Sequence, residues 1–192
     1  MDNNALFEAL VRTAISCGAD RATVMDADKL VTDTCFRDMC AANACGVYGK
    51  CYMCPPDVGD IHELMQSLSK YAYVLVYQRI GALEDSFDYG GMQDARRAQY
   101  RLAQALRDAL DALPLPNALH LGAGGCGVCQ TCAKRVGEPC RFPDRAMASL
   151  EAYGIHVSEM ARAAGMNYIN GANTVTYFGA VLFNKEDTDA DA

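Results

Sequence analysis

Nine of the ten cysteines of this 192-residue chain are concentrated in two short segments. Such a concentration argues for a chemical role of these segments, because thiols are oxidisable and a small apolar residue would fill a core without that reactivity. The first residues lack the basic and apolar regions of a secretory signal, which predicts a cytoplasmic protein. In a reducing compartment, clustered cysteines are more typical of metal binding or redox chemistry than of disulfides. The sequence therefore predicts two cysteine-rich metal-binding loops, with cysteines at positions 35, 40, 45, 51 and 54, and at 126, 129, 132 and 140.

The second segment has the cysteine spacing by which bacterial ferredoxin loops hold an iron-sulfur cluster. Cys126, Cys129 and Cys132 are each separated by two residues, and in ferredoxins each thiolate of such a run binds a different iron. Structural zinc is the alternative, although it is usually held by two separated cysteine pairs. The spacing favours a cluster over zinc. The glycines around the run let the backbone approach closely and direct N–H groups at sulfur, which makes them candidate cofactor-binding residues: Gly124, Gly125 and Gly127.

The fourth ligand of this run is not at the ferredoxin position. Cys140 follows Cys132 after seven residues and is not followed by proline, whereas Cys54 is. In two-cluster ferredoxins, the cysteine before proline binds the cluster that its neighbours do not. By analogy, we hypothesise that Cys54 completes the site of Cys126 to Cys132, while Cys140 crosses to Cys40 and Cys45.

The cysteine pattern as a whole resembles a known family. Cys40 to Pro56, Gly125 to Cys132, Pro139 to Pro143 and Ser149 to Val157 are similar to segments of a prokaryotic family with a domain of unknown function (DUF2284), whose members are described as predicted metal-binding proteins. The resemblance covers most of the chain. It implies seven ligands, namely Cys40, Cys45, Cys54, Cys126, Cys129, Cys132 and Cys140.

Two clusters held only by cysteine need eight ligands, one more than the resemblance implies. Cys51 lies three residues before Cys54, and this C-x2-C arrangement favours ligation. Either Cys51 or Cys35 supplies the eighth ligand, or one iron lacks a cysteine. An iron without a protein thiolate is open to substrate and acts as a Lewis acid, which distinguishes an enzyme from an electron carrier.

Three further residues are candidates near the cofactor. Tyr48 lies between the cysteines of the first segment and is expected either in a turn or near the cluster, where it would limit access of water. Arg141, beside Cys140, either offsets the negative charge of a thiolate-bound cluster or faces solvent. All three histidines are expected at packed or surface positions, and His156 is the best candidate for an exception with a role at the site.

Periodicity predicts a single α/β or α+β domain, in which helices flank a small, mostly buried sheet. Apolar residues recur at helical spacing near the N-terminus, after Asp60, from Met92 to Leu113, and from about 145 to 164 with an interruption near Gly154. The segment from 34 to 56 has no sustained period and is expected to be a loop. Proline at 114 and 116 is expected to end the longest helix. Strands are expected at 23–31, 71–80, 118–121 and 174–183.

Composition excludes several other classes of protein. The net charge of −7, without a stripe of Lys and Arg, argues against nucleic-acid binding. The longest apolar run, 175–183, is too short to span a membrane. Residues 1–184 are expected to form one cysteine-rich domain, and residues 185–192 an acidic disordered tail.

We therefore expect an iron-sulfur protein with one or two 4Fe-4S clusters that passes single electrons to or from a redox partner protein. Two alternatives follow from the same cysteines. One is an enzyme with a substrate-binding open iron near Tyr48, Arg141 or His156, and the other is a zinc-stabilised interaction module.

Overall fold

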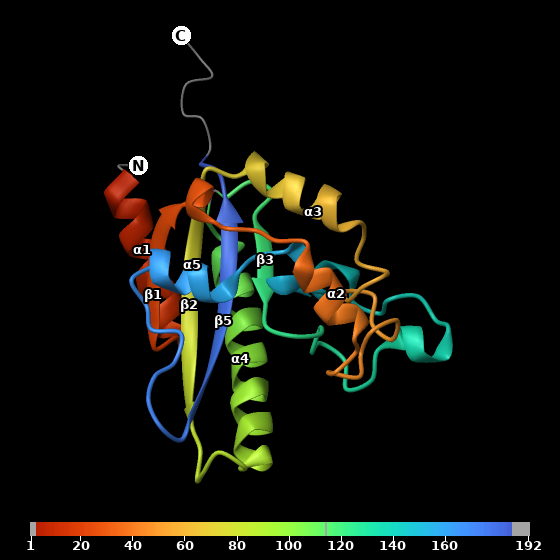
Figure 1. Ribbon diagram of the computed structural model, residues 1–192. Coiled ribbons are helices and arrows are strands. Elements are labelled where there is room, and N and C mark those ends of the chain that lie inside the picture. Colours follow the sequence, from red (N-terminus) through yellow and green to blue (C-terminus); the bar gives the residue numbers. More distant parts are fainter. Residues whose placement is uncertain (1–2, 114, 186–192) are drawn as a thin grey trace.

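A five-stranded mixed sheet forms the centre of the protein in the computed structural model, which describes residues 3–113 and 115–185 (Figure 1). The strand order is β1-β2-β5-β3-β4, and every neighbouring pair is antiparallel except β3 and β4. This largely antiparallel sheet confirms the predicted class of fold in its α+β form. The strands are β1 (Arg21–Asp26), β2 (Tyr73–Ala82), β3 (Leu119–Gly122), β4 (Ala148–Ser149) and β5 (Thr174–Phe183).

The two longest strands lie in the middle of the sheet. β2 and β5 pair along their whole length, from Tyr73 opposite Phe183 to Ala82 opposite Thr174. Apolar side chains occupy both faces of this pair: Leu75 and Val181 point to one face, and Val76 and Ala180 to the other. Because both faces are buried here, Val74 to Tyr77 of β2 and Tyr177 to Phe183 of β5 form continuous apolar runs instead of alternating with polar residues.

Helices cover each face of the sheet. α1 (Asn3–Ser16) and α4 (Tyr89–Leu110) cover one face, and α5 (Val157–Ala163) packs on the other. α4 starts at a side-chain cap, where the Asp88 carboxylate accepts a hydrogen bond from the Gly91 N–H. The remaining helical segments are α2 (Cys35–Ala41), α3 (Ile61–Ser67) and the short 3-10 helices Ala27–Lys29, Leu68–Lys70, Ala133–Val136, Pro143–Arg145 and Glu151–Tyr153.

Three local expectations from sequence differ from the structure. The segment expected to be a loop from 34 to 56 contains α2, whose two turns are too short to produce a helical period. Of the helices expected between 145 and 164, the part after Gly154 is present as α5, whereas the part before it is replaced by 3-10 helices and the two-residue strand β4, because Ala148 and Ser149 pair with β3. The strand expected at 23–31 ends at Asp26, where a 3-10 helix begins.

The expectations for Pro114 and for most of the C-terminal tail concern residues that lie outside the described part of the chain. Of the acidic tail predicted at 185–192, only Lys185 is described. Within residues 3–113 and 115–185, no helix combines the length and apolar character needed to cross a membrane.

The two cysteine segments lie together beyond the β3–β4 edge of the sheet. Figure 1 shows α2 and the chain that follows it beside the long loop after β3, on the side of the sheet away from α1. The sheet therefore acts as a frame that brings together two segments separated by more than seventy residues of sequence.

Candidate metal centre

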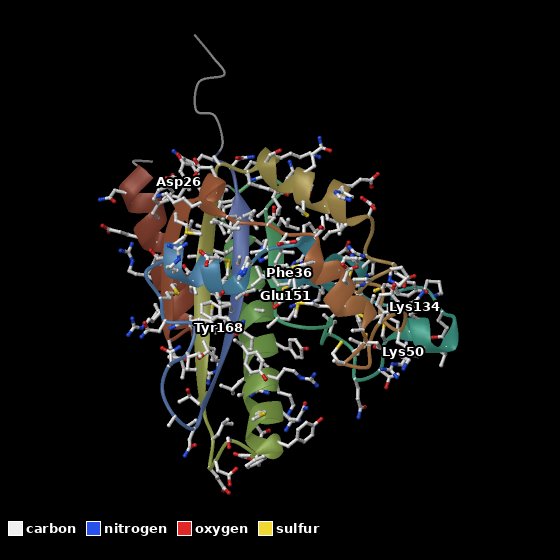
Figure 2. All side chains as sticks on the ribbon, in the orientation of Figure 1. Asp26, Phe36, Lys50, Lys134, Glu151 and Tyr168 are labelled. Carbon is white, nitrogen blue, oxygen red and sulfur yellow. The ribbon has the colours of Figure 1, made fainter. Side chains whose placement is uncertain are left out.

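Polar side chains join the two cysteine segments directly. The Tyr52 hydroxyl donates a 2.8 Å hydrogen bond to the Glu138 carbonyl oxygen. Lys134 forms an ion pair with Asp57, and its ammonium group lies 5.2 Å from the centre of the Tyr52 ring. These contacts hold the first segment against the second on one side of the sheet (Figure 2, where Lys134 is labelled). Sequence reasoning missed Tyr52, since a single tyrosine between cysteines carries no distinctive signal.

One group of thiols, here called the five-cysteine site, combines residues of both segments. All five line the same narrow cavity of about 20 Å³. Cys51 is the residue contributed by the first segment, and its side chain is only 4% exposed. Its sulfur receives hydrogen bonds from the Cys132 thiol and from the backbone N–H of Cys126. The members are Cys51, Cys126, Cys129, Cys132 and Cys140.

The other thiols, here called the three-cysteine site, come from the first segment alone. Cys40, Cys45 and Cys54 line a larger cavity of about 370 Å³, beside Gly124 and Gly125 of the second segment. The pKa of Cys40 is raised, mainly by burial and also by the charge of the nearby Cys45. Cys54 is 7% exposed and forms the inner end of the group.

The two sites meet at the pair of Cys51 and Cys54. Their thiols are hydrogen-bonded to each other. Hydrogen bonds from the Cys54 thiol, from the N–H groups of Met53 and Cys126 and from the Cys132 thiol lower the pKa of Cys51 to about 6. The pKa of Cys54 is raised, first because its thiol donates to Cys51 and second because it is buried. Of the two thiols, that of Cys51 therefore loses its proton more readily.

The division of ligands differs from the crossed arrangement inferred by analogy with ferredoxins. Cys54, not Cys140, is grouped with Cys40 and Cys45, and Cys140 remains with the other cysteines of its own loop. A cysteine of the first segment does cross to the second, but it is Cys51. The C-x2-C spacing allows this, because the N–H of Cys54 bonds to the carbonyl of Cys51 in a turn that places the two residues in different sites.

Glycines of the second segment allow the close packing around the sulfurs. A Cβ atom on Gly125 would lie 3.3 Å from the Cys54 sulfur, and one on Gly127 would lie 2.3 Å from Cδ2 of Tyr100. Tyr100 of α4 also donates a 2.7 Å hydrogen bond to the Gly125 carbonyl. Gly124 has a left-handed backbone, with φ of 69°. The contact with Tyr100 of α4 thus fixes the path of the cysteine loop. The sequence did not indicate this contact.

Backbone N–H groups point at the first cysteine of this loop. The Cys126 sulfur accepts hydrogen bonds from the N–H groups of Val128 and Met147, which lower its pKa, whereas burial raises it by more. Donors of this kind stabilise the thiolate form that metals require. Met147 lies just before β4, so the short strand that sequence reasoning missed also positions a donor at the site.

Two cationic side chains lie close to the five-cysteine site. Arg141 is paired with Glu138 at 2.8 Å and is close enough to Cys129 and Cys132 for their charges to contribute to its raised pKa. Lys134 is likewise near Cys132. Arg141 therefore lies where it would offset part of the negative charge of bound thiolates, although its side chain remains about half exposed, at 46%.

Tyr48 and His156 are located at the three-cysteine site, where both line the 370 Å³ cavity. The backbone N–H of Tyr48 is bonded to the Asn43 side-chain oxygen at 3.0 Å. His156 follows the 3-10 helix Glu151–Tyr153 and immediately precedes α5. Glu151 lines the same cavity and was not anticipated from sequence.

The remaining cysteines and histidines lie elsewhere. Cys17 follows α1 and packs against the core cluster of α1 and α4. Cys35 is exposed at the start of α2 and lines neither of the two cysteine cavities, so it is not placed as an eighth ligand. His62 is on α3, and His120 is on β3.

The spacing of the thiols bears on the kind of metal group that they would hold. Among the described residues, no three His, Cys, Asp or Glu side chains converge closely enough to bind a single metal ion. Four sulfurs around one zinc ion would lie about 3.8 Å apart, given a zinc–sulfur distance of about 2.3 Å. The cysteines are gathered in two groups, and among the described residues neither group surrounds a single ion in this way.

Comparison with known proteins agrees with the pattern of cysteines. A family model described as "Predicted metal-binding protein (DUF2284)" matches residues 23–183, which include both cysteine segments and four of the five strands in full. The chain belongs to the DUF2284 family. The resemblance noted from sequence is thereby confirmed, and the family description supports metal binding without specifying the metal. Searches of curated proteins and of solved structures gave no significant match to this DUF2284 protein.

Proposed function

We propose that this DUF2284 protein is an iron-sulfur protein that carries single electrons to or from a partner protein. The observation that carries the proposal is the gathering of the cysteines at two cavities, with Cys51 beside the cysteines of the second segment in one and Cys54 beside Cys40 and Cys45 in the other. It joins eight thiols from two remote segments into two adjacent sites. A 4Fe-4S cluster bound at such a site supplies reversible one-electron chemistry.

The donor set fits iron-sulfur clusters in three respects. Its donors are predominantly thiols, which are the ligands that these clusters prefer. Backbone N–H groups point at the sulfurs of Cys51 and Cys126, as expected where thiolates bind a cluster. Gly125 leaves space next to the Cys54 sulfur that a Cβ atom would restrict.

The sequence spacing of Cys126, Cys129 and Cys132 supports a cluster over a single zinc ion. In a cluster each iron is held by one thiolate, so the sulfurs surround a body larger than one ion, whereas a structural zinc ion draws four ligands together. Three cysteines at successive x2 spacings suit such a body better than a single ion.

The arrangement also supports transfer of electrons between the two sites. Cys51 and Cys54 are buried and in hydrogen-bonding contact, so the two sites are connected by adjacent sulfurs. At the five-cysteine site, Cys129, Cys132 and Cys140 are only partly buried. At the three-cysteine site, Cys40 is likewise partly buried and Cys45 is exposed. Either site could therefore face the redox partner, and the other would exchange electrons through it.

A second candidate function is supported by the larger cavity. The three-cysteine site offers one thiol fewer than a cluster has irons, and it lines a 370 Å³ space in the size range of small-molecule sites. An iron without a thiolate at this place would be open to a substrate. On this reading, the five-cysteine site supplies electrons to an enzyme active site.

The test is to purify the protein without oxygen and measure iron and acid-labile sulfide per chain, together with Mössbauer and electron paramagnetic resonance spectra. We expect about eight irons and eight sulfides for two clusters. Cys51→Ala should alter the spectrum of the five-cysteine site, and Cys54→Ala that of the three-cysteine site. Cys17→Ala is the matched control, because Cys17 packs near the sheet and lines neither cavity.

A colourless protein that binds zinc under these conditions, and no iron or sulfide after reconstitution, would overturn the proposal in favour of the zinc-stabilised module. Loss of the same cluster from both the Cys51 and Cys54 variants would retain the iron-sulfur assignment but refute the division into two sites. Reoxidation of the reduced protein by small molecules only, and never by a redox protein, would favour the enzyme over the carrier.

A further inference from the structure

The cavity at the three-cysteine site is enclosed by three parts of the chain. α2 and the turns after it form one wall, residues 149–158 form the opposite wall, and Gly124 and Gly125 lie at the inner end with Cys54. Tyr168 lies at the rim, where it is 51% exposed and stacks on Phe178 with the ring centres 5.9 Å apart. Figure 2 shows Phe36, Glu151 and Tyr168 on the same side of the molecule, in front of the sheet.

The ionisable groups of the cavity are unfavourable for an anion. Neither lysine nor arginine is among its lining residues, which include the thiols of Cys40, Cys45 and Cys54 and the carboxylate of Glu151. Arg37 is near enough to lower the pKa of Cys40, but its guanidinium donates to the Ala152 carbonyl and does not line the cavity. A phosphate or carboxylate ligand would therefore lie near the Glu151 carboxylate without a lysine or arginine to pair with, which costs binding free energy.

One polar group in the cavity is oriented and available. His156 is held by two neighbours: its Nδ1 is 3.2 Å from the Ser158 hydroxyl, and its ring stands edge-to-face on Phe36 with 5.4 Å between the ring centres. No hydrogen bond to Nε2 is formed among the described residues. Depending on the tautomer, this nitrogen is either a donor or an acceptor for a ligand.

Apart from Ser149 and Ser158, the rest of the lining is apolar or aromatic. Phe36, Tyr48 and Tyr168 provide aromatic rings, and the other side chains are mostly aliphatic. Aromatic rings prefer to pack against such surfaces in stacked or edge-to-face geometry. The cavity has a volume of about 370 Å³, at the small end of the range for ligand sites, and a cluster held by its three cysteines would fill the inner part, so the matching molecule is also small.

We propose that this cavity binds a small, uncharged aromatic molecule whose single polar group hydrogen-bonds to Nε2 of His156. The ligand lies between the aromatic side chains of the rim and the three cysteines. The inference rests on the proposed function to the extent that cluster-bound cysteines supply the negative charge. The shape of the cavity, His156 and Glu151 do not depend on it.

The test uses benzamide and benzoate, which have the same shape but differ by one charge. Benzamide has both a donor and an acceptor, so it matches either tautomer of His156. Saturation-transfer NMR on the anaerobic, iron-loaded protein should show benzamide binding at least tenfold more tightly than benzoate. Glu151→Gln should reduce this ratio at least threefold, because it removes one negative charge from the wall.

Two tryptophan variants determine where the ligand binds. Ala44→Trp places a large side chain at an exposed position that lines the cavity, and it should abolish benzamide binding. Ala42→Trp is the matched control, since Ala42 is exposed two residues away and does not line the cavity. Both should retain the iron content and the circular dichroism spectrum of the parent protein, because neither side chain is buried.

Each outcome separates this inference from the proposed function. Iron-loaded protein that does not bind benzamide, or that binds benzoate equally well, overturns the inference while the proposed function stands. Equal loss of binding in the Ala42→Trp and Ala44→Trp variants overturns the location. Protein without iron or sulfide that still binds benzamide, and loses it in Ala44→Trp alone, refutes the proposed function but supports the cavity as a ligand site.

Discussion

The packing of Tyr100 against Gly127 gives a quantitative prediction for the loop that holds Cys126. A methyl group at position 127 would lie 2.3 Å from Cδ2 of the tyrosine ring, so the ring or the loop must move. Overpacking of this kind costs about 1–3 kcal/mol. Displacing the ring also breaks the 2.7 Å hydrogen bond from Tyr100 to the Gly125 carbonyl, a loss of about 1 kcal/mol.

An opposing contribution comes from the unfolded chain. Replacing glycine by alanine lowers the entropy of the unfolded state and stabilises the protein by about 0.4–1 kcal/mol. Gly127 is not among the glycines with a left-handed backbone, so alanine adds no backbone strain there. The net expectation for Gly127→Ala is a loss of about 2 kcal/mol in the free energy of unfolding.

A double-mutant cycle isolates the contact. In a Tyr100→Ala background the ring is absent, and Gly127→Ala should then cost less than about 0.5 kcal/mol, which implies a coupling energy of about 2 kcal/mol. Urea unfolding of the four proteins, kept anaerobic and followed by circular dichroism, measures these values. If Gly127→Ala costs the same in both backgrounds, the close approach of ring and loop is not the reason for glycine at this position.

Three further predictions concern stability. Gln99 is fully buried on α4, and its side-chain amide has no hydrogen-bond partner among the described residues. Gln99→Met should therefore raise the free energy of unfolding by about 1 kcal/mol in urea titrations. A lower free energy of unfolding would show that the amide is hydrogen-bonded in solution. Burial lowers the pKa of His120 to about 4 from its ordinary value of 6.5. Between these pH values the unfolded chain therefore binds more protons than the folded protein. The contribution of His120 to stability should be constant above pH 6.5 and should be lost as the pH falls towards 4. The free energy of unfolding should then fall by about 2 kcal/mol more than in His120→Gln, and equal pH profiles of the two proteins would contradict this. Asp60→Ala removes the side chain that caps α3 by accepting hydrogen bonds from the N–H groups of His62 and Glu63. Thermal unfolding should show that the free energy of unfolding falls by about 1 kcal/mol. Asp28→Ala is the control, and it should change this free energy little.

Sequence patterns predicted the elements that carry a strong local signal. β2 and β5 each contain a long apolar run because the middle of the sheet is buried on both faces, and α4 has a long apolar stripe. α2 and β4 could not be predicted in this way. Two turns of helix and a two-residue strand are too short for a period, and β4 exists because it pairs with β3.

The amino-acid sequence by itself determined which atoms are available for chemistry: the cysteines, their spacing and the glycines among them. Only the tertiary structure decided which thiols share a site, since that depends on how two segments remote in sequence meet. Cys51 and Cys54 are three residues apart, yet a turn directs one to the five-cysteine site and the other to the cavity of Cys40 and Cys45. Local spacing favours ligation by both residues, but the partner of each is set by packing between segments, which no short-range pattern encodes.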